Sequence, residues 1–415
     1  MTDRDNSTPP DVICRVCGGQ VEEFLDLGDQ PVSQRFRTPE DTSDEFFFRL
    51  AIGHCTTCTM VQLIEDVPRE EMFHEDYPFA SSSSHYMSEY FVGVARDFLE
   101  TELTGPDPFI VEVGSNDGVM LRTISEAGVR HLGFEPSGNV AELARSTGVR
   151  VCNEFFEEST ARKIAADDGP ADVIYSANTI CHIPYLDSIF RGVDALLGPN
   201  GVFVFEDPYL GDIIAKRSFD QIYDEHFYLF SGRSVKAAAN RFGFDLVDVR
   251  RLPVHGGEVR YTIARLGARP PSAAVAALLA EEAERELTAT ATLRRFADDV
   301  LAIRADLVAK LTALRDEGCR VVGYGATAKS ATVLNFCGIG PDLIQFISDT
   351  TVAKQGLVTP GQHIPVRAPS DFAEDYPDYA VLLAWNHAEE VMAKEREFVA
   401  GGGRWLLYVP DVHVE

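Results

Sequence analysis

The fold is decided by residues 108–120, which read PFIVEVGSNDGVM. An apolar run at 109–113, interrupted only by Glu112, predicts a short buried strand. Small residues follow at 114–118, and the run from 119 to 127 has helical character. This order of strand, glycine turn and helix presents free backbone N–H groups at a helix start, which suits a nucleotide-like ligand.

A second strand with a terminal acid supports this interpretation. Residues 130–134 predict a strand that ends on Glu135. A carboxylate at the end of the second strand of a Rossmann-like unit can accept hydrogen bonds from both ribose hydroxyls. The turn is not GxGxxG, so an ordinary strand-to-helix turn with a solvated acid is the alternative.

Length and composition set the outer limits. A chain of 415 residues predicts two or three domains at about 150 residues each. It has no run of about 18 apolar residues and no signal-peptide core, so we expect a cytoplasmic protein without a membrane span. The net charge of −28 argues against a nucleic-acid partner, because phosphate backbones require a basic surface. No protein partner is indicated.

Two C-x-x-C pairs predict a zinc site in a domain over residues 12–70. The pairs are Cys14 with Cys17 and Cys55 with Cys58. Zinc takes four thiolates tetrahedrally, and each C-x-x-C turn offers two sulfurs. Four protein ligands leave no open position, so the predicted zinc is structural and stabilises a small domain. A redox pair or four buried thiols are the alternatives.

The rest of the chain alternates strands with helices and predicts α/β domains. Further strands are expected at 149–152, 171–176 and 202–206, which indicates a parallel sheet with ligands at the carboxyl ends of its strands. We expect residues 1–11 to be a disordered lead and 71–266 the central domain. Residues 267–316 should form a helical linker with one apolar face.

A second α/β unit is expected at 317–415. It contains another glycine turn entering a helix, GYGATAKS at 323–330. Lys329 at this helix start can contact a phosphate, so a diphosphate site is one interpretation. A purely structural Rossmann-like unit is the alternative.

The segment QIYDEHFY at 221–228 concentrates groups that can do acid–base chemistry. Tyr223, Glu225 and His226 lie within four positions of one another. Histidine titrates near neutrality, so His226 can act as a general base, and His182 at the end of the fourth strand is the second candidate. A structural histidine in a polar loop is the alternative. The serine run at 81–84 is either a linker or a polar rim for a sugar or phosphate.

The order of these motifs resembles the class I methyltransferases that use S-adenosylmethionine. VEVGSNDG is similar to their glycine loop, GFEP to their ribose-binding acid, and LLGPNGVFVFE to the turn before their fifth strand. The resemblance implies that Glu135 binds the ribose and Asn178 lies near the sulfonium. The turn departs from many relatives at 115–117, where they have more glycine. The cofactor residues implied are Glu112, Gly114, Ser115, Asn116, Phe134, Glu135, Asn153, Glu154, Phe155 and Asn178.

The combination of all three units resembles one family over nearly the whole chain. These are the C-methyltransferases of nucleotide-linked keto-deoxysugars in antibiotic biosynthesis, among them the C-3′-methyltransferases for the branched nitro or amino sugar of tetronate antibiotics. The implied architecture is a class I methyltransferase Rossmann-like sheet flanked by an N-terminal four-cysteine zinc domain and a C-terminal Rossmann-like domain. The implied substrate is a TDP-linked 4-keto-deoxy (amino)sugar, methylated at C-3′ next to the ketone.

The resemblance also implies roles for side chains in this reaction. A base removes the proton next to the ketone, and the enolate attacks the sulfonium methyl. We expect His226 to be the base and Glu225 to orient or polarise it, with Tyr223, His182 and Tyr77 as donors to the enolate or sugar. The substrate-binding residues expected are Ser81, Ser83, Tyr86, Gly325, Ala326, Lys329 and Asn386.

Other functions remain open at this point. The chain could be a zinc-containing methyltransferase for another small molecule, RNA or protein. It could also be a protein with two nucleotide sites and no chemistry, or an NAD dehydrogenase that uses GYGATAKS.

Overall fold

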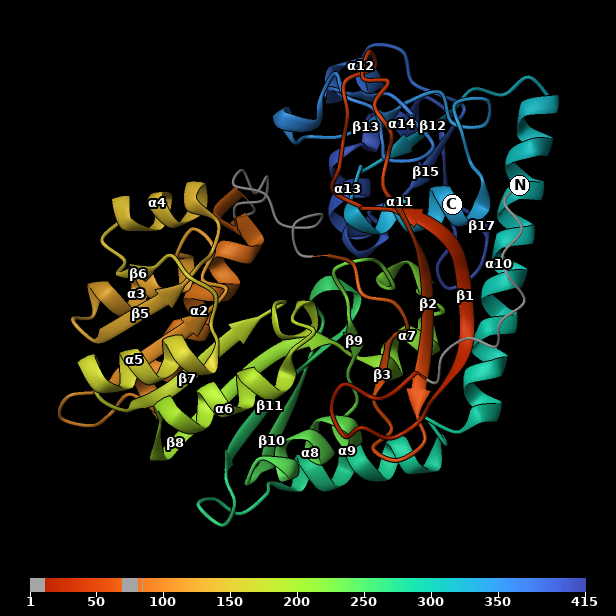
Figure 1. The fold of residues 1–415 in the computed structure, drawn as a ribbon. Helices are drawn as coiled ribbons and strands as arrows, with labels where there is room; N and C mark the ends of the chain where they lie inside the picture. Colours follow the sequence, from red (N-terminus) through yellow and green to blue (C-terminus); the bar gives the residue numbers. More distant parts are fainter. Residues whose placement is uncertain (1–11, 69–80, 84) are drawn as a thin grey trace.

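Three β-sheets organise the structure, a computed structural model that describes residues 12–68, 81–83 and 85–415 (Figure 1). The N-terminal sheet is antiparallel and includes one strand from far along the chain. Its order is β1 (Val21–Pro31), β2 (Phe47–Cys55), β3 (Val61–Leu63) and β9 (Tyr228–Leu229). Val61 pairs with Leu229, so the first unit is continuous with the segment that follows His226.

The central sheet contains the strand predicted from residues 109–113. All five residues of β4 (Phe109–Val113) are buried, because helices cover both faces of the sheet. Strands β4 to β8 run parallel, and two antiparallel strands close one edge. The sheet order is β10 (Phe244–Leu252), β11 (Glu258–Arg265), β8 (Leu197–Pro208), β7 (Ala171–Ala177), β4, β5 (Arg130–Phe134) and β6 (Val151–Cys152).

Alternating residues of the central strands supply two separate cores. Ile110, Val173 and Val204 pack with residues of α2 (His85–Thr101) and α3 (Val119–Glu126). Val111, Ile174 and Phe203 belong to the large core on the opposite face. The other helices of this region are α4 (Gly138–Ser146), α5 (Glu158–Asp168), α6 (Leu186–Leu196), α7 (Leu210–Lys216) and α8 (Gly232–Arg241).

The C-terminal sheet is a second parallel sheet with one antiparallel edge. Its order is β14 (Val366–Arg367), β13 (Ile347–Ser348), β12 (Val321–Tyr324), β15 (Tyr379–Leu382), β16 (Arg404–Leu407) and β17 (His413–Val414). Its helices are α11 (Ala328–Cys337), α12 (Pro369–Glu374), α13 (Ala388–Lys394) and α14 (Arg396–Ala400).

The segment expected as a linker packs into the molecule. After α9 (Ala273–Glu284), the long helix α10 (Thr290–Asp316) runs beside β1 and reaches the C-terminal sheet (Figure 1). Its apolar side chains recur every three or four residues and are buried in the large core. They are Phe296, Val300, Ile303, Leu307, Leu311 and Leu314.

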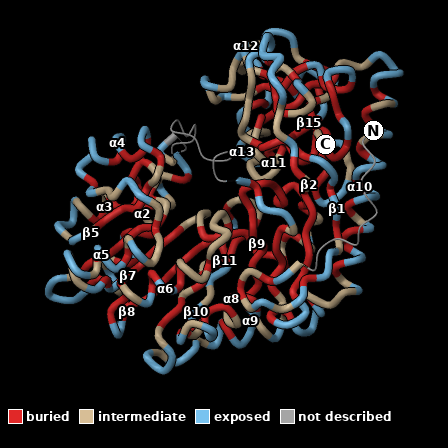
Figure 2. The backbone as a smooth tube through the Cα atoms, viewed as in Figure 1, coloured by how far each residue is buried: buried red, intermediate tan, exposed pale blue. Residues whose placement is uncertain are grey.

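Burial follows the three sheets, while the outer helix faces and the turns are exposed (Figure 2). One hydrophobic core runs from the N-terminal sheet through one face of the central sheet into the C-terminal sheet. No helix in the described part of the chain is long and apolar enough to cross a membrane.

Candidate active site

The glycine turn after β4 adopts the conformation that its sequence requires. Gly114 has φ +74°, and a Cβ at this position would lie 2.4 Å from Thr179 Oγ1, so only glycine fits. The backbone N–H groups of Gly114 and Ser115 donate to the carbonyl of Phe134 at 2.9 and 3.0 Å. The turn is thereby fixed to the end of β5.

Glu135 lies directly against this turn. The N–H of Asn116 donates to Glu135 Oε2 at 2.9 Å, and the N–H of Ser137 donates to Oε1 at 2.8 Å. Burial raises the pKa of the Glu135 carboxyl, and these backbone donors counteract the rise. Asn153 joins the group, since its Nδ2 donates to the Glu135 carbonyl at 2.7 Å.

Three buried polar atoms around the turn lack a hydrogen-bond partner within the described residues. They are Ser115 Oγ, Asp117 Oδ1 and Glu112 Oε2. Burial raises the pKa of Glu112, and nearby Asp117 and Glu135 raise it further. Such unpaired groups fit a polar ligand held at the turn.

The other predicted cofactor residues surround the same strand ends. Asn178 follows β7 with φ +47°, and its N–H donates to the Glu206 carbonyl at 2.8 Å. Glu154 is exposed and Phe155 half-buried just after β6.

The serine run contacts the glycine turn. The N–H of Ser81 donates to Asn116 Oδ1 at 2.9 Å, and the N–H of Ser82 donates to Asp117 Oδ2 at 3.0 Å. Ser83 ends the same short helical turn, and Tyr86 is 51% exposed on the first turn of α2. Tyr77 lies outside the described residues.

His226 is buried with one ring nitrogen already engaged. Its Nδ1 lies 2.6 Å from the backbone carbonyl of Gln221. A carbonyl only accepts, so Nδ1 carries the hydrogen and Nε2 is left with the lone pair. Burial lowers the pKa of His226 well below its usual range, and His182 lowers it further.

Two further predicted catalytic residues pack against this imidazole. The ring of His182 stacks on it at 5.1 Å between centroids, and the ring of Tyr223 lies 4.0 Å away. Burial lowers the pKa of His182 to about 4. His226, His182 and Tyr223 therefore form one cluster.

Glu225 has a different environment from the one expected. The atom that holds His226 is the Gln221 carbonyl, whereas Glu225 is within electrostatic range of Asp224 and Lys354. Burial raises the pKa of Glu225 to about 8, Asp224 adds to the rise, and Lys354 opposes it.

Lys329 reaches the same region from the C-terminal sheet. Its ammonium is buried, lacks a hydrogen-bond partner among the described residues, and lies 5.6 Å from the ring of Trp385. Burial lowers its pKa, while Asp220 and Glu258 raise it. Lys329 in turn lowers the pKa of His226, so the two side chains lie within electrostatic range of each other.

The remaining residues of the second glycine turn are mostly engaged. A Cβ on Gly325 would lie 2.7 Å from Ala384 Cβ, so this glycine allows the turn to approach the end of β15 closely. The N–H of Ala326 already donates to Asp349 Oδ2 at 2.7 Å. Asn386 is half-buried in the helical turn Trp385–His387.

Sequence reasoning missed several residues of this junction. Glu258, at the start of β11, has no exposed surface, and neither carboxyl oxygen has a partner in the described part of the chain. Asp220 is buried between the central and C-terminal sheets, where Trp385 and Tyr408 donate to it. The sequence feature that could have indicated Glu258 is its position directly after the paired glycines at 256–257.

The four N-terminal cysteines converge as predicted. Their ligand atoms all lie within 4.8 Å of one another. Cys14 and Cys58 have sulfurs 3.5 Å apart, and those of Cys17 and Cys55 are 3.4 Å apart. Backbone N–H groups of Gly19, Thr57 and Cys58 point at these sulfurs. This donor set fits a tetrahedral zinc ion.

A second group of ligand-type atoms lies at the His226 cluster. Cys181, His182 and His226 also place such atoms within 4.8 Å. Burial and nearby Asp207 raise the pKa of Cys181 well above its usual range.

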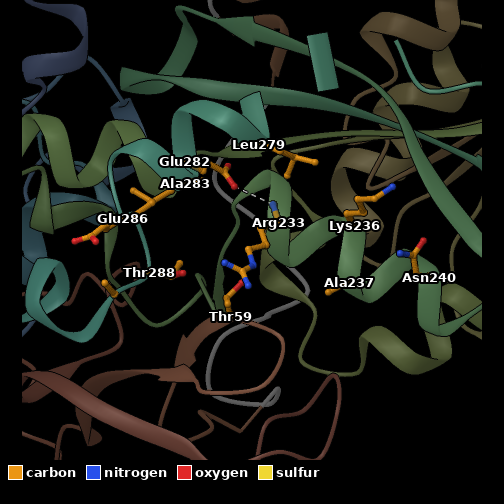
Figure 3. Close-up of a pocket in the computed structure, with 12 residues that line it drawn as sticks. Thr59, Arg233, Lys236, Ala237, Asn240, Leu279, Glu282, Ala283, Glu286 and Thr288 are labelled. Carbon is orange, nitrogen blue, oxygen red and sulfur yellow. Dashed lines mark hydrogen bonds between the residues drawn. The ribbon is translucent and has the colours of Figure 1, made fainter. Parts of the chain in front are cut away.

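A pocket of about 730 Å³ lies elsewhere, between α8 and α9 (Figure 3). Charged residues including Arg233, Lys236, Glu282 and Glu286 line it. None of the predicted site residues contributes to its walls, so it is separate from the His226 cluster.

Three family models together match most of the chain. They are described as "Putative zinc binding domain" for residues 14–73, "Methyltransferase domain" for 85–249 and "C-methyltransferase C-terminal domain" for 253–410. The C-methyltransferase NovU of Streptomyces niveus is 34% identical over 409 residues, which are 97% of this chain and 96% of that protein.

More distant similarities are confined to part of the chain. Sarcosine/dimethylglycine N-methyltransferase of Halorhodospira halochloris is 22% identical over 176 residues, which are 39% of this chain and 61% of that protein. A solved S-adenosylmethionine-dependent methyltransferase structure from Anabaena variabilis covers 48% of this chain and 100% of its own, at 17% identity and a TM-score of 0.34.

Proposed function

The chain belongs to the family of S-adenosylmethionine-dependent C-methyltransferases, and from this premise we propose that it methylates C-3′ of a TDP-linked 4-keto-deoxy (amino)sugar in antibiotic sugar biosynthesis. Its cofactors are S-adenosylmethionine and Zn²⁺. The four-cysteine site has no position left for a substrate, so the zinc is structural.

The observation that carries the proposal is the state of His226. Its Nδ1 is held by the Gln221 carbonyl, and its Nε2 keeps a lone pair in a buried cluster with His182 and Tyr223. A carbon next to a ketone must lose a proton before it can be methylated. A neutral imidazole with one free nitrogen can take that proton.

The methyl donor is proposed to lie along the ends of β4, β5 and β7. Gly114 and Asn116 would contact its methionine part, Glu135 its ribose, and Asn153, Glu154 and Phe155 its adenine. Glu112, Ser115 and Phe134 would line the same turn, and Asn178 would lie near the sulfonium. Bound S-adenosylmethionine supplies a methyl group activated on a positively charged sulfur.

Side chains around His226 would then complete the reaction. Nε2 of His226 accepts the proton next to the ketone, and negative charge develops on the ketone oxygen. In this proposal the hydrogen-bond donors to that oxygen or to the sugar are Tyr223, His182 and Tyr77. Glu225 belongs to the same loop as His226. Fixed donors in a buried site stabilise such charge more than water does.

The nucleotide is proposed to bind between the serine run and the C-terminal sheet. Lys329 is the supporting residue, because a buried ammonium without a hydrogen-bond partner among the described residues suits a diphosphate. Ser81, Ser83 and Tyr86 would contribute from one side, and Gly325, Ala326 and Asn386 from the other. In a chain of net charge −28, local donors of this kind are needed to hold an anion.

Replacing His226 tests the function. We expect His226→Asn to lose methyl transfer to a TDP-4-keto-deoxysugar by about 100-fold or more, since a positioned base contributes about 10²–10⁴-fold. Affinity for S-adenosylhomocysteine, measured by calorimetry, should be unchanged. The rate at which the sugar proton next to the ketone exchanges with deuterium oxide, followed by NMR, should fall together with the rate of methyl transfer.

His413→Asn, in the last strand, is the matched control and should behave as wild type. Near-normal turnover in His226→Asn would remove this residue from the role of base. Loss of activity confined to His182→Asn would transfer the role to His182. A wild-type enzyme that methylates no TDP-keto-sugar would contradict the substrate class itself.

A further inference from the structure

The loop that carries His226 is attached to the C-terminal sheet at Asp220. The Asp220 Oδ2 atom accepts a hydrogen bond from Trp385 Nε1 at 2.6 Å and another from Tyr408 Oη at 2.7 Å. Asp220 and Tyr408 have no exposed surface, so water does not compete for these bonds. Trp385 and Tyr408 follow β15 and β16, respectively, at the carboxyl ends of both strands.

The two residues after Asp220 are fixed as well. Gln221 Nε2 donates to the His255 carbonyl at 2.7 Å, and Thr332 Oγ1 of α11 donates to the Ile222 carbonyl at 2.9 Å. A Cβ on Gly256 would lie 2.5 Å from the Trp385 ring and 3.3 Å from Gln221 Nε2, so the turn at 255–256 packs against both side chains.

The backbone carbonyl of Gln221 therefore lies between two anchored residues, Asp220 and Ile222. This carbonyl contacts His226 Nδ1 at 2.6 Å. Whatever fixes the carbonyl also fixes the tautomer and the orientation of the imidazole. General bases are commonly oriented by such a partner on their second nitrogen.

We propose that Asp220 is a positioning residue for His226. Trp385 and Tyr408, which follow two strands of the C-terminal sheet, act through Asp220 to hold the base in its reactive orientation. The inference rests on the proposed function, because it assigns Asp220 to the base of that reaction. It gives the C-terminal sheet a role in the chemistry, beyond any role in holding a nucleotide.

Conservative removal of each donor tests the proposal. Trp385→Phe removes the indole N–H and keeps an aromatic ring, and Tyr408→Phe removes only the hydroxyl. We expect kcat to fall roughly 10- to 100-fold in each, because a small displacement of a catalytic group has an effect of this order. KM for the sugar nucleotide and the affinity for S-adenosylhomocysteine should stay at wild-type values.

The other tryptophan of the chain provides the matched control. Trp405 is buried in the same sheet at 1% exposure, and its indole N–H has no hydrogen-bond partner among the described residues. Trp405→Phe should retain wild-type kcat even if the melting temperature falls. Wild-type kcat in Trp385→Phe and Tyr408→Phe, or an equal loss of kcat in Trp405→Phe, overturns the proposal.

A measurement without turnover separates this inference from the proposed function. In protein labelled with ¹⁵N-histidine, the His226 signal is assigned by its loss in His226→Asn. We expect the Nδ1–H tautomer in wild type and a shifted signal in Trp385→Phe and in Asp220→Asn. If the wild-type enzyme acts on no keto-sugar, the proposed function fails, and the His226 signal alone then tests the positioning role of Asp220. An unchanged signal in both variants overturns that role.

Discussion

At the scale of single residues, burial sets the protonation states of the site. His226 and His182 are kept neutral because a charged imidazole loses its hydration in this interior. The same burial raises the pKa of Glu225 to about 8 and that of Asp207 to about 8. Burial therefore favours the neutral form of both the two histidines and the two carboxyl groups.

The lowered pKa of His226 predicts an unusual pH profile. The base acts when it is neutral, which is the case above its pKa, so the acid limb of kcat/KM should lie below pH 6.5. At pH 6, an ordinary histidine of pKa about 6.5 would be only about one-quarter neutral. We expect essentially full methyl transfer at pH 6, measured as S-adenosylhomocysteine release.

Cofactor affinity measured at pH 6 and pH 7.5 serves as the control for this profile. If binding is constant and the rate at pH 6 is about a quarter of its plateau, an ordinary histidine is the base. That result would rule out a buried His226 in the role.

At the scale of elements, α8 begins on a carboxylate from another helix. The N–H of Arg233 donates to Glu282 of α9 at 3.0 Å (Figure 3). The N–H of Gly232 and the hydroxyl of Tyr209 donate to the same carboxylate at 2.7 and 3.1 Å. A negative group at a helix start satisfies its free N–H groups and interacts favourably with the helix dipole. These hydrogen bonds fix the start of α8, which follows β9 and the loop that carries His226.

Glu282→Ala should therefore destabilise the fold. Loss of a buried cap of this kind costs about 1–3 kcal/mol. The melting temperature, followed by circular dichroism, should fall by roughly 2–10 °C. Glu286→Ala alters an exposed acid of the same pocket and should have no such effect. Equal melting temperatures for the two variants would show that Glu282 is not a structural cap.

At the scale of the whole molecule, the zinc unit is built into the site. β3 pairs with β9, which begins two residues after His226. The N–H of Ser33 donates to Asp224 Oδ1 at 3.1 Å. Gly361 and His363 of the C-terminal region bond Glu45 at 2.9 and 3.0 Å. The N-terminal unit thus contacts both the loop that carries His226 and the C-terminal region.

Loss of zinc should accordingly reduce methyl transfer as well as stability. We expect Cys14→Ser to lose the metal, measured by mass spectrometry of metal content, with a lower melting temperature and a lower kcat. Cys319→Ser alters a partly buried cysteine outside the cluster and should keep one zinc per chain. Wild-type kcat in zinc-free Cys14→Ser would show that the site does not depend on this unit.

The sequence by itself determined the parts whose cause is local. The strand at 109–113, the conformation of Gly114 and the pairing of two C-x-x-C turns follow from side-chain size, apolar pattern and metal chemistry at short range. Residues 197–201, read as a turn, extend β8 instead, because Leu197 pairs with Ala171 of the neighbouring strand.

Only the tertiary structure decided the contacts between distant segments. Glu258 became a site residue because folding buried it without a partner among the described residues, and Gln221 became the partner of His226 through its backbone, which carries no sequence signal. Asp220 meets Trp385 and Tyr408 across 165 and 188 residues of chain. Burial and long-range hydrogen bonding depend on how three sheets pack, and no periodicity in a single segment records that packing.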